Sequence, residues 1–218
     1  MQIGLFGGTF DPIHNGHLRA VLDVMETFPL DRCMLIPAAA PPHKARPDMA
    51  EVSDRLEMVR LAAGGVEGLE VSEVEIRRSG PSYTVHTIRH FQKILPSGTR
   101  ILLLLGIDAF FEIDSWHAWQ ELLGAVPLIV MTRPVGDEPA SRAVAAEFLR
   151  RRIRDGYRFD PEAGGFLHPD LPTVYYRKVT LLDISSTDIR RRIQGGRSIR
   201  FLLPEAVERY IVERKLYR

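Results

Sequence analysis

The stretch GGTFDPIHNGHL, Gly7 to Leu18, joins an apolar run to a segment with helical spacing. The apolar run, Ile3–Phe6, predicts a buried strand. The helix is predicted from apolar residues that recur on one face, namely Leu18, Val21, Leu22 and Met25. A strand followed by a glycine-rich turn and a helix is typical of α/β proteins with a parallel sheet.

The same alternation continues along most of the chain. Further buried strands are predicted at Cys33–Ile36, Leu69–Ile76, Ile101–Leu105, Leu128–Met131 and Val179–Leu182. Helices are predicted around Leu56–Ala62, at Tyr83–Leu95 and at Pro204–Leu216. The alternation predicts an α/β fold: a Rossmann-like open parallel sheet with helices on both faces and a small C-terminal helical part.

The segment from about Gly136 to Pro172 departs from this alternation. A helix with a basic end is predicted at Ala143–Ile153, and an irregular loop at Asp160–Pro172. We interpret the segment, 136–172, as an insertion in a single domain that spans residues 1–218. A solvated surface insertion is favoured over a lid or a partner contact.

Composition limits the class of protein. The chain has 218 residues and a net charge of +1, which argues against a dedicated nucleic-acid binder. Its single cysteine, Cys33, excludes an internal disulfide and fits a reducing compartment. No signal-peptide pattern is present, and no apolar run approaches the roughly 20 residues of a membrane span. We expect a cytoplasmic protein with neither membrane nor nucleic acid as a partner.

The opening stretch has the features of an anion site. Gly7 and Gly8 follow a strand of the predicted parallel sheet, at the edge where ligands bind. The following helix directs its N–H groups and positive dipole end toward the same place. His14 and His17, three residues apart, can donate hydrogen bonds to phosphate oxygens as charge develops. Two alternatives remain: a metal pair, which needs a third ligand, and a capping turn with incidental histidines.

A second candidate anion site lies in LLDISSTDIRRRI, Leu181 to Ile193. Ser185, Ser186 and Thr187 offer hydroxyls at a predicted helix start, and Arg190 follows one turn later. Taken alone, this pattern is also that of an ordinary helix cap with surface arginines. Two such sites after strands of one sheet favour a triphosphate ligand.

These motifs, with others in the same order, resemble the bacterial nicotinate-nucleotide adenylyltransferases. That family belongs to the HxGH nucleotidyltransferase superfamily, which also includes class I aminoacyl-tRNA synthetases. The supporting motifs are HNGH at His14–His17, ISSTDIR at Ile184–Arg190, PPHK at Pro41–Lys44, Arg55, SYT at Ser82–Thr84, GIDAF at Gly106–Phe110, Trp116, and RP at Arg133–Pro134.

The resemblance implies a role for each matching residue. His14, His17 and Arg190 would be the catalytic residues, holding the ATP phosphates and stabilising the transition state. The implied ATP-binding residues are Gly8, Thr9, Phe10, Gly106, Asp108, Ser185 and Ser186. The implied mononucleotide-binding residues are Lys44, Ser82, Tyr83, Thr84, Trp116 and Arg133. No protein metal site is implied, because Mg²⁺ would be carried with ATP.

The resemblance implies transfer of the adenylyl group of ATP to nicotinate mononucleotide, which gives nicotinate adenine dinucleotide and pyrophosphate in NAD biosynthesis. Catalysis would consist of positioning and charge stabilisation. Two departures from the family pattern stand out: His86 replaces an acidic residue, and Val135 precedes Gly136. The alternatives are another acceptor, such as nicotinamide mononucleotide or phosphopantetheine, and a nucleotide sensor without turnover. Homo-oligomerisation is left open.

Overall fold

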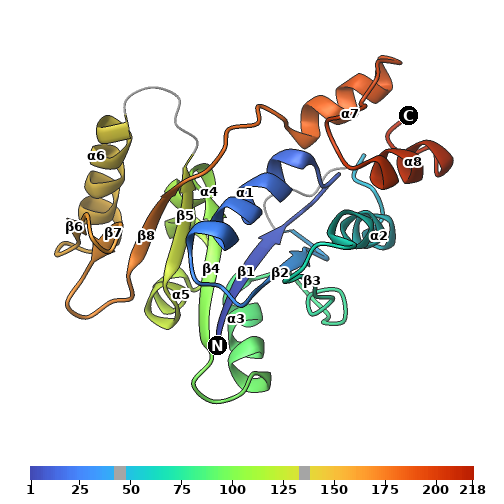
Figure 1. The fold of residues 1–218 in the computed structure, drawn as a ribbon. Helices are drawn as coiled ribbons and strands as arrows, with labels where there is room; N and C mark the ends of the chain where they lie inside the picture. The colour runs from blue at the N-terminus through green and yellow to red at the C-terminus, as the bar shows by residue number, and fades with distance from the viewer. Residues whose placement is uncertain (42–47, 133–137) are drawn as a thin grey trace.

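The computed structural model describes residues 1–41, 48–132 and 138–218. Within these ranges, eight strands form one sheet in the order β3-β2-β1-β4-β5-β8-β7-β6 (Figure 1). The strands are β1 (Gln2–Gly8), β2 (Arg32–Pro37), β3 (Leu69–Val71), β4 (Arg100–Gly106), β5 (Leu128–Thr132), β6 (Arg158–Asp160), β7 (Gly165–Leu167) and β8 (Val174–Lys178). The six strands from β3 to β8 in this order are parallel, and the antiparallel pairings, β8–β7 and β7–β6, lie at one edge.

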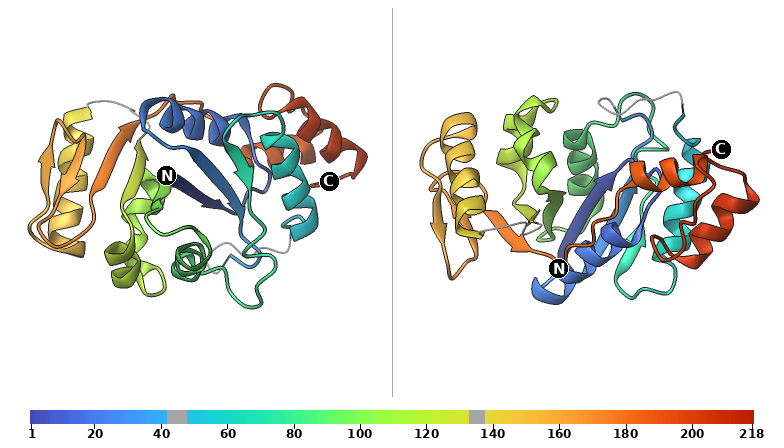
Figure 2. Two further views of the ribbon diagram at one scale, coloured as in Figure 1. Left: turned by 60° about the horizontal axis from the view of Figure 1, so that its bottom comes forward. Right: turned by 90° about the horizontal axis from the view of Figure 1, so that it is seen from above.

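The helices lie on both faces of the sheet, as the sequence predicts (Figure 2). They are α1 (Asn15–Thr27), α2 (Val52–Ala63), α3 (Thr84–Ile94), α4 (Ile107–Phe111), α5 (Trp119–Ala125), α6 (Glu138–Phe148), α7 (Ser186–Gln194) and α8 (Glu205–Glu213). One apolar core joins α1, α2, α7 and α8 to the sheet, and the other joins α3, α4, α5 and α6. Alternate residues of β4 face the two cores: Leu102 and Leu104 point to one, and Leu103 and Leu105 to the other.

Strand β1 lies at the centre and marks the point where the strand order reverses. From β1 the chain runs outward through β2 to β3, and α3 then leads back to β4 on the other side of β1. In an open parallel sheet, such a reversal leaves a crevice at the carboxyl ends of the two strands involved. Gly8 and Gly106 end those strands, so the crevice lies where the opening stretch begins.

Two predicted strands have different bounds in the structure. The strand predicted over Leu69–Ile76 ends at Val71, because the chain then turns. The prediction of a strand at Val179–Leu182 is wrong, since β8 occupies Val174–Lys178. The amide of Thr180 donates to Asp23 Oδ2 of α1 at 2.5 Å instead of to a neighbouring strand, which ends the ladder.

The segment predicted to be an insertion is more regular than expected. After α6, a π-helical turn at Leu149–Ile153 leads into the β6–β7 hairpin, which pairs with β8 and extends the sheet. The prediction of an irregular loop over Asp160–Pro172 is therefore wrong, since it contains the end of β6 and all of β7. Arg177 of β8 stabilises the hairpin turn by donating to the carbonyls of Gly164 and Ala163 at 2.8 and 3.1 Å.

Across the described ranges, no helix is long and apolar enough to cross a lipid bilayer.

Candidate active site

A cavity of about 220 Å³ opens at the carboxyl ends of β1 and β4. Many of the predicted site residues line it: Gly8, Thr9, Ser82, Tyr83, Thr84, Gly106 and Trp116. A side chain at position 8 would place its Cβ 2.8 Å from the Phe10 ring, so only glycine leaves room for that ring. A wider depression beside Gly64 and Gly65, away from these strand ends, is open to solvent and brings no predicted site residues together.

His14 and His17 begin α1, and their rings stack with centroids 3.7 Å apart. The backbone N–H of His14 donates to Nδ1 of His17 at 3.3 Å, as in a capping box. Because Nδ1 of His17 accepts this hydrogen bond, the proton of a neutral His17 ring is on Nε2. The capping contact therefore makes Nε2–H of His17 a hydrogen-bond donor.

The ring of Phe10 packs against the ring of His17. The backbone of Phe10 is left-handed, with φ 47°, which costs about 1–2 kcal/mol for a residue other than glycine. Its ring packs edge-to-face on His17, with centroids 5.3 Å apart, and on Phe6 at 5.7 Å. The buried aromatic pair thus fixes the position of the His17 ring.

The second predicted anion site lies against the first. Ser186, the first residue of α7, donates from Oγ to the carbonyl of Pro12 at 2.8 Å. Arg190 donates to the carbonyl of Asp11 at 2.6 Å and to Thr187 Oγ1 at 3.2 Å. The two helix N-termini therefore meet at the Asp11–Pro12 segment, although they are far apart in sequence. Ser185 is the N-cap of α7, where its Oγ accepts from the Asp188 amide.

Arg55 holds the loops around the cavity together, a task that sequence reasoning did not assign to it. The residue is 1% exposed. It donates to four backbone carbonyls at 2.7–3.3 Å, those of Thr9, Ala38, Ala39 and Ala50. Burial lowers the pKa of Arg55, although the nearby Asp11 carboxylate opposes this effect. One side chain from α2 thus joins the loop after β1, at Thr9, to the connection between β2 and α2, at Ala38, Ala39 and Ala50.

One wall of the cavity is aromatic and is formed by Tyr83, Trp116 and His117. Tyr83 stacks on His117 with ring centroids 4.2 Å apart, and Trp116 lies beside them in the lining. His86, which replaces the acidic residue of the family pattern, contacts both Tyr83 and His117 edge-on at 5.7 Å. Burial, followed by the charges of Arg78, Arg89 and His117, lowers the pKa of His86. This wall offers flat apolar surfaces for a planar ring.

Sequence reasoning also missed two polar residues of this cavity. Thr87 donates from Oγ1 to Glu75 Oε1 at 2.6 Å, and both side chains are buried in the lining. Glu75 comes from the segment predicted as a strand, and the turn after Val71 brings it inward. No sequence motif predicts this pair, because its two members belong to different elements.

Not all predicted residues lie in the cavity lining. Asp108 lies in the first turn of α4 and is exposed. The catalytic candidates His14, His17 and Arg190 lie next to the cavity, on the side of Gly8 and Thr9. Lys44 and Arg133 fall outside the described residues. Among the side chains described within residues 141–172, none lines the cavity.

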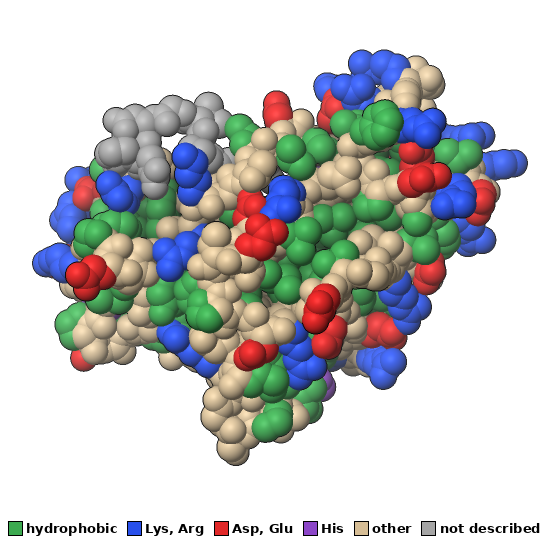
Figure 3. Space-filling view, in the orientation of Figure 1, with side chains coloured by type: hydrophobic (Ala, Val, Ile, Leu, Met, Phe, Trp, Pro, Cys, Tyr) green, Lys and Arg blue, Asp and Glu red, His purple; other side chains and the backbone are tan. Residues whose placement is uncertain are grey.

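Charged side chains of both signs lie around the site. Lys and Arg side chains gather over α7 and α8 in the space-filling view (Figure 3). Two buried arginines, Arg55 and Arg190, lie near the buried carboxylate of Asp11, and Glu75 adds a buried carboxylate to the cavity lining. Among the residues that the structure describes, no three His, Cys, Asp or Glu side chains come together as a metal site would require.

The geometry described above is that of a nucleotidyltransferase, and the comparisons with known proteins agree. Residues 5–192 match the cytidylyltransferase-like family, so the chain belongs to that family. A protein of Desulfatibacillum aliphaticivorans, described as a probable nicotinate-nucleotide adenylyltransferase, is 42% identical over 219 residues and covers 100% of both chains. One from Geobacter sp. (strain M21) with the same description is 41% identical, covering 100% of this chain and 98% of its own. Within the larger family, the chain therefore belongs to the nicotinate-nucleotide adenylyltransferases.

The fold is shared with solved structures of low sequence identity. A structure of Plasmodium falciparum nicotinic acid mononucleotide adenylyltransferase complexed with APC has a TM-score of 0.69 at 17% identity, and the match covers 99% of this chain and 96% of that chain. The predicted Rossmann-like α/β fold and the predicted family resemblance are confirmed.

Proposed function

We infer that the chain transfers the adenylyl group of ATP to nicotinate mononucleotide. The products are nicotinate adenine dinucleotide and pyrophosphate, as a step in NAD biosynthesis. The single observation that carries this inference is the meeting of two helix N-termini at Asp11–Pro12, next to a cavity with an aromatic wall. A triphosphate fits the first feature and a pyridine mononucleotide fits the second.

In the proposed reaction, an oxygen of the mononucleotide phosphate attacks the α-phosphorus of ATP in line. A bond forms between that oxygen and the α-phosphorus, and the bond to the bridging oxygen of pyrophosphate breaks. Pyrophosphate leaves with the bonding electron pair, so no protein nucleophile is needed. Rate enhancement comes from orienting the reactants and from stabilising charge on the phosphate oxygens.

The phosphate side of the site is assigned to residues on α1 and α7. His17, with its Nε2–H, and His14 donate to phosphate oxygens as charge develops during transfer. Arg190, the hydroxyl of Ser185 and the backbone N–H of Ser186 bind the triphosphate from the other helix, because the hydroxyl proton of Ser186 is donated to Pro12. The backbone at Gly8, Thr9 and Phe10 lines the nucleotide path, and Gly106 and Asp108 lie near a ribose.

The acceptor side is assigned to the cavity. Tyr83 and Trp116 receive the nicotinate ring, and the backbone N–H groups around Thr84 bind its carboxylate, with Ser82 beside them. The amide of Ala40 donates to Ser82 Oγ at 3.2 Å, which fixes the wall next to this ring. The roles of Lys44 and Arg133 on the mononucleotide phosphate stay predictions, since both fall outside the described residues.

Mg²⁺ belongs to the proposal as a companion of ATP. Hard cations of this kind are bound largely by substrate phosphates and water, with few protein ligands. The donor set near the site fits that arrangement, because histidines, hydroxyls and arginines surround the proposed phosphate position. Mg²⁺ would neutralise part of the triphosphate charge, and the protein residues bind the remaining oxygens.

The test uses purified protein with ATP and Mg²⁺ and compares nicotinate mononucleotide with nicotinamide mononucleotide and phosphopantetheine. The adenylylated product of each acceptor and pyrophosphate are measured together. Rapid turnover with the nicotinate form and much less with the others supports the proposal. Preference for another acceptor would reassign the cavity, and ATP binding without turnover would favour the alternative of a sensor.

Three further predictions accompany this function. We treat residues 1–218 as one nucleotidyltransferase domain with an insertion at about 136–172, and the continuous sheet supports this division. We place the protein in the cytoplasm, in accord with its one cysteine, which is buried. Homo-oligomerisation stays open, and light scattering would measure it.

A further inference from the structure

The cavity assigned to the acceptor contains a buried acidic side chain that the proposed reaction does not use. Glu75 is 7% exposed and lines the cavity together with Tyr83 and Trp116, to which the nicotinate ring is assigned. The other carboxylate of the described lining belongs to Glu112, which is exposed. Neither lysine nor arginine occurs among the described residues of this lining. The described walls around the acceptor are therefore aromatic and acidic.

The carboxylate of Glu75 is held in place from α3. Thr87 donates from Oγ1 to Glu75 Oε1 at 2.6 Å, and Arg78 NH1 in turn donates to the same Thr87 oxygen at 3.4 Å. An ionised carboxylate accepts hydrogen bonds and donates none, so the Thr87 hydroxyl stabilises the charged form of Glu75. The hydroxyl thus lies between Glu75 and the guanidinium of Arg78.

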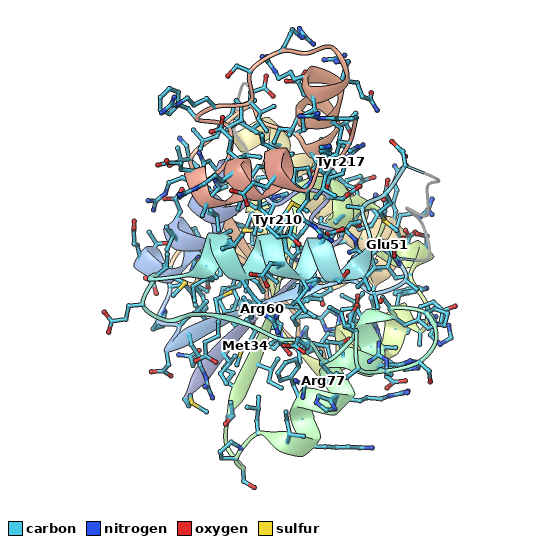
Figure 4. The ribbon with its side chains drawn as sticks, turned by 90° about the vertical axis from the view of Figure 1, so that its right-hand side faces the viewer. Met34, Glu51, Arg60, Arg77, Tyr210 and Tyr217 are labelled. Atoms are coloured by element: carbon cyan, nitrogen blue, oxygen red, sulfur yellow. The ribbon has the colours of Figure 1, made fainter. Side chains whose placement is uncertain are left out.

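The other arginines around this segment pair with a different glutamate. Figure 4 shows Arg60 on α2, with Arg77 below it on the segment that leads to α3. Both arginines form ion pairs with Glu73, and Arg77 donates to Glu73 Oε2 at 3.1 Å. Among the described residues, no lysine or arginine forms an ion pair with Glu75. Its negative charge is therefore available to a ligand in the cavity.

The acceptor of the proposed reaction carries a positive charge in its ring. The ring nitrogen of nicotinate mononucleotide is bonded to the ribose, which makes the aromatic ring a pyridinium cation. Cations bind to the faces of aromatic side chains, as Tyr83 and Trp116 offer them here. A buried carboxylate is costly unless a positive charge or further donors compensate it, and a pyridinium ring in this cavity supplies the positive charge.

We propose that Glu75 is a specificity-determining residue that acts as the counter-ion of the pyridinium ring of the acceptor. The inference rests on the proposed function and names the feature of the acceptor that this side chain recognises. The carboxylate group of the acceptor stays assigned to the backbone N–H groups around Thr84. Glu75 therefore selects for the charge of the ring and not for the acid or amide group attached to it.

The test compares two acceptors that differ in ring charge. One is nicotinate mononucleotide, and the other is a C-nucleoside analogue in which an uncharged 3-carboxyphenyl ring is attached to the same ribose phosphate. Calorimetric titration in the presence of a non-reactive α,β-methylene analogue of ATP gives both dissociation constants. We expect the wild type to bind the nicotinate form about ten-fold more tightly, the low end of what a close charge pair contributes. Equal dissociation constants would overturn the proposal.

Glu75→Gln removes the charge and keeps an oxygen that accepts from Thr87. In this variant the preference for the charged ring should fall to about two-fold, the share that the aromatic faces contribute. Glu112→Gln is the matched control, because Glu112 lines the same cavity but is exposed, where water screens its charge. The control should keep the preference of the wild type. A preference retained in Glu75→Gln, or lost equally in Glu112→Gln, would overturn the proposal.

A purely structural role of Glu75 predicts a different result. Damage to the cavity wall would weaken the binding of both acceptors alike and leave their ratio unchanged. If Glu75→Gln does not fold, Glu75→Asp and Glu75→Asn repeat the comparison of a charged with a neutral side chain at a shorter length. The preference should be larger in the Asp variant, and equal preferences in the two variants would overturn the proposal.

Turnover separates this inference from the function on which it rests. If the wild type converts nicotinate mononucleotide and ATP to dinucleotide but does not prefer the charged ring, only the role of Glu75 fails. If it binds ATP but neither binds nor converts either acceptor, the proposed function fails, and the role of Glu75 fails with it.

Discussion

The rings of His14 and His17 stack at a centroid distance of 3.7 Å and an interplanar angle of 25° at the start of α1. A shared metal ion would require their nitrogen lone pairs, which lie in the ring planes, to converge on one point. Nearly parallel stacked rings do not have that geometry, and Nδ1 of His17 already accepts the His14 amide. The pair is better suited to present two N–H donors to one anion.

Replacing His17 with Ala should reduce kcat by about 10²–10³-fold, because a donor to the developing phosphate charge is lost. ATP binding should largely survive, since the backbone and α7 contacts remain. Pyrophosphate release at saturating ATP measures the first effect, and calorimetric titration with ATP measures the second. His90→Ala, at an exposed position of α3, is the control. Unchanged kcat in His17→Ala would remove His17 from the catalytic residues.

Replacing Arg55 with Met should lower the free energy of unfolding by about 3–5 kcal/mol, because buried polar partners lose a charged donor. The four carbonyls of Thr9, Ala38, Ala39 and Ala50 would be left without it. Arg60→Met on the same helix is the control. Arg60 has a half-exposed side chain paired with Glu73, so its loss should cost less than about 1 kcal/mol. Urea unfolding measures both variants, and similar losses would contradict a special role for Arg55.

His86 should make the protein less stable in mild acid. Burial and the charges of Arg78 and Arg89 lower its pKa below the value of 6.5 for an unperturbed histidine. As the pH falls through 6.5, the unfolded chain binds a proton at this position before the folded protein does. The free energy of unfolding therefore decreases until the pH reaches the lower pKa of the folded state. His86→Gln should remove this part of the pH dependence, and unfolding curves between about pH 5 and 8 measure it. Parallel curves for the two proteins would refute the prediction.

The Thr87–Glu75 hydrogen bond should stabilise the cavity wall. Thr87→Val keeps the shape of the side chain but leaves Glu75 Oε1 without this donor, which should cost about 1–3 kcal/mol. Thr87→Ser keeps the hydroxyl and loses only a methyl group, at about 0.8 kcal/mol. Thermal unfolding ranks the two variants, and KM for nicotinate mononucleotide should rise in Thr87→Val. A Ser variant less stable than the Val variant would show that packing, and not the hydrogen bond, is what matters at this position.

Local sequence pattern was enough to predict the central part of the fold. Runs such as Ile101–Leu105 are long and apolar at every position, so β1, β2, β4 and β5 were predicted at nearly their observed bounds. Strand β7 has three residues, too few to show a period, and β8 consists of the mixed sequence VYYRK. The strand was predicted instead at the more apolar sequence VTLL, residues 179–182. The amide of Thr180 donates to Asp23 and therefore does not pair with a neighbouring strand.

The candidate site was predictable only in part. Glycines and histidines at a strand–helix junction form a local motif, and the structure brings the separate motif of Ser186 and Arg190 to it. The supporting contacts of Arg55, Thr87 and Tyr217, whose hydroxyl donates to Asp11, join residues from distant parts of the chain. Arg55 is part of the family pattern but was given no role by it, and nothing in the immediate neighbours of Thr87 and Tyr217 distinguishes them from ordinary surface or core residues.

The contacts that join Asp11 to Arg190 and Tyr217 close loops of 179 and 206 residues. Closing such loops costs chain entropy before any contact energy is gained, and folds rich in distant pairings form slowly. Individual helices form within about a microsecond. During refolding, helical content should therefore return well before the ability to bind a nucleotide. The interval between the two is a stage at which the protein has its secondary structure but is still inactive.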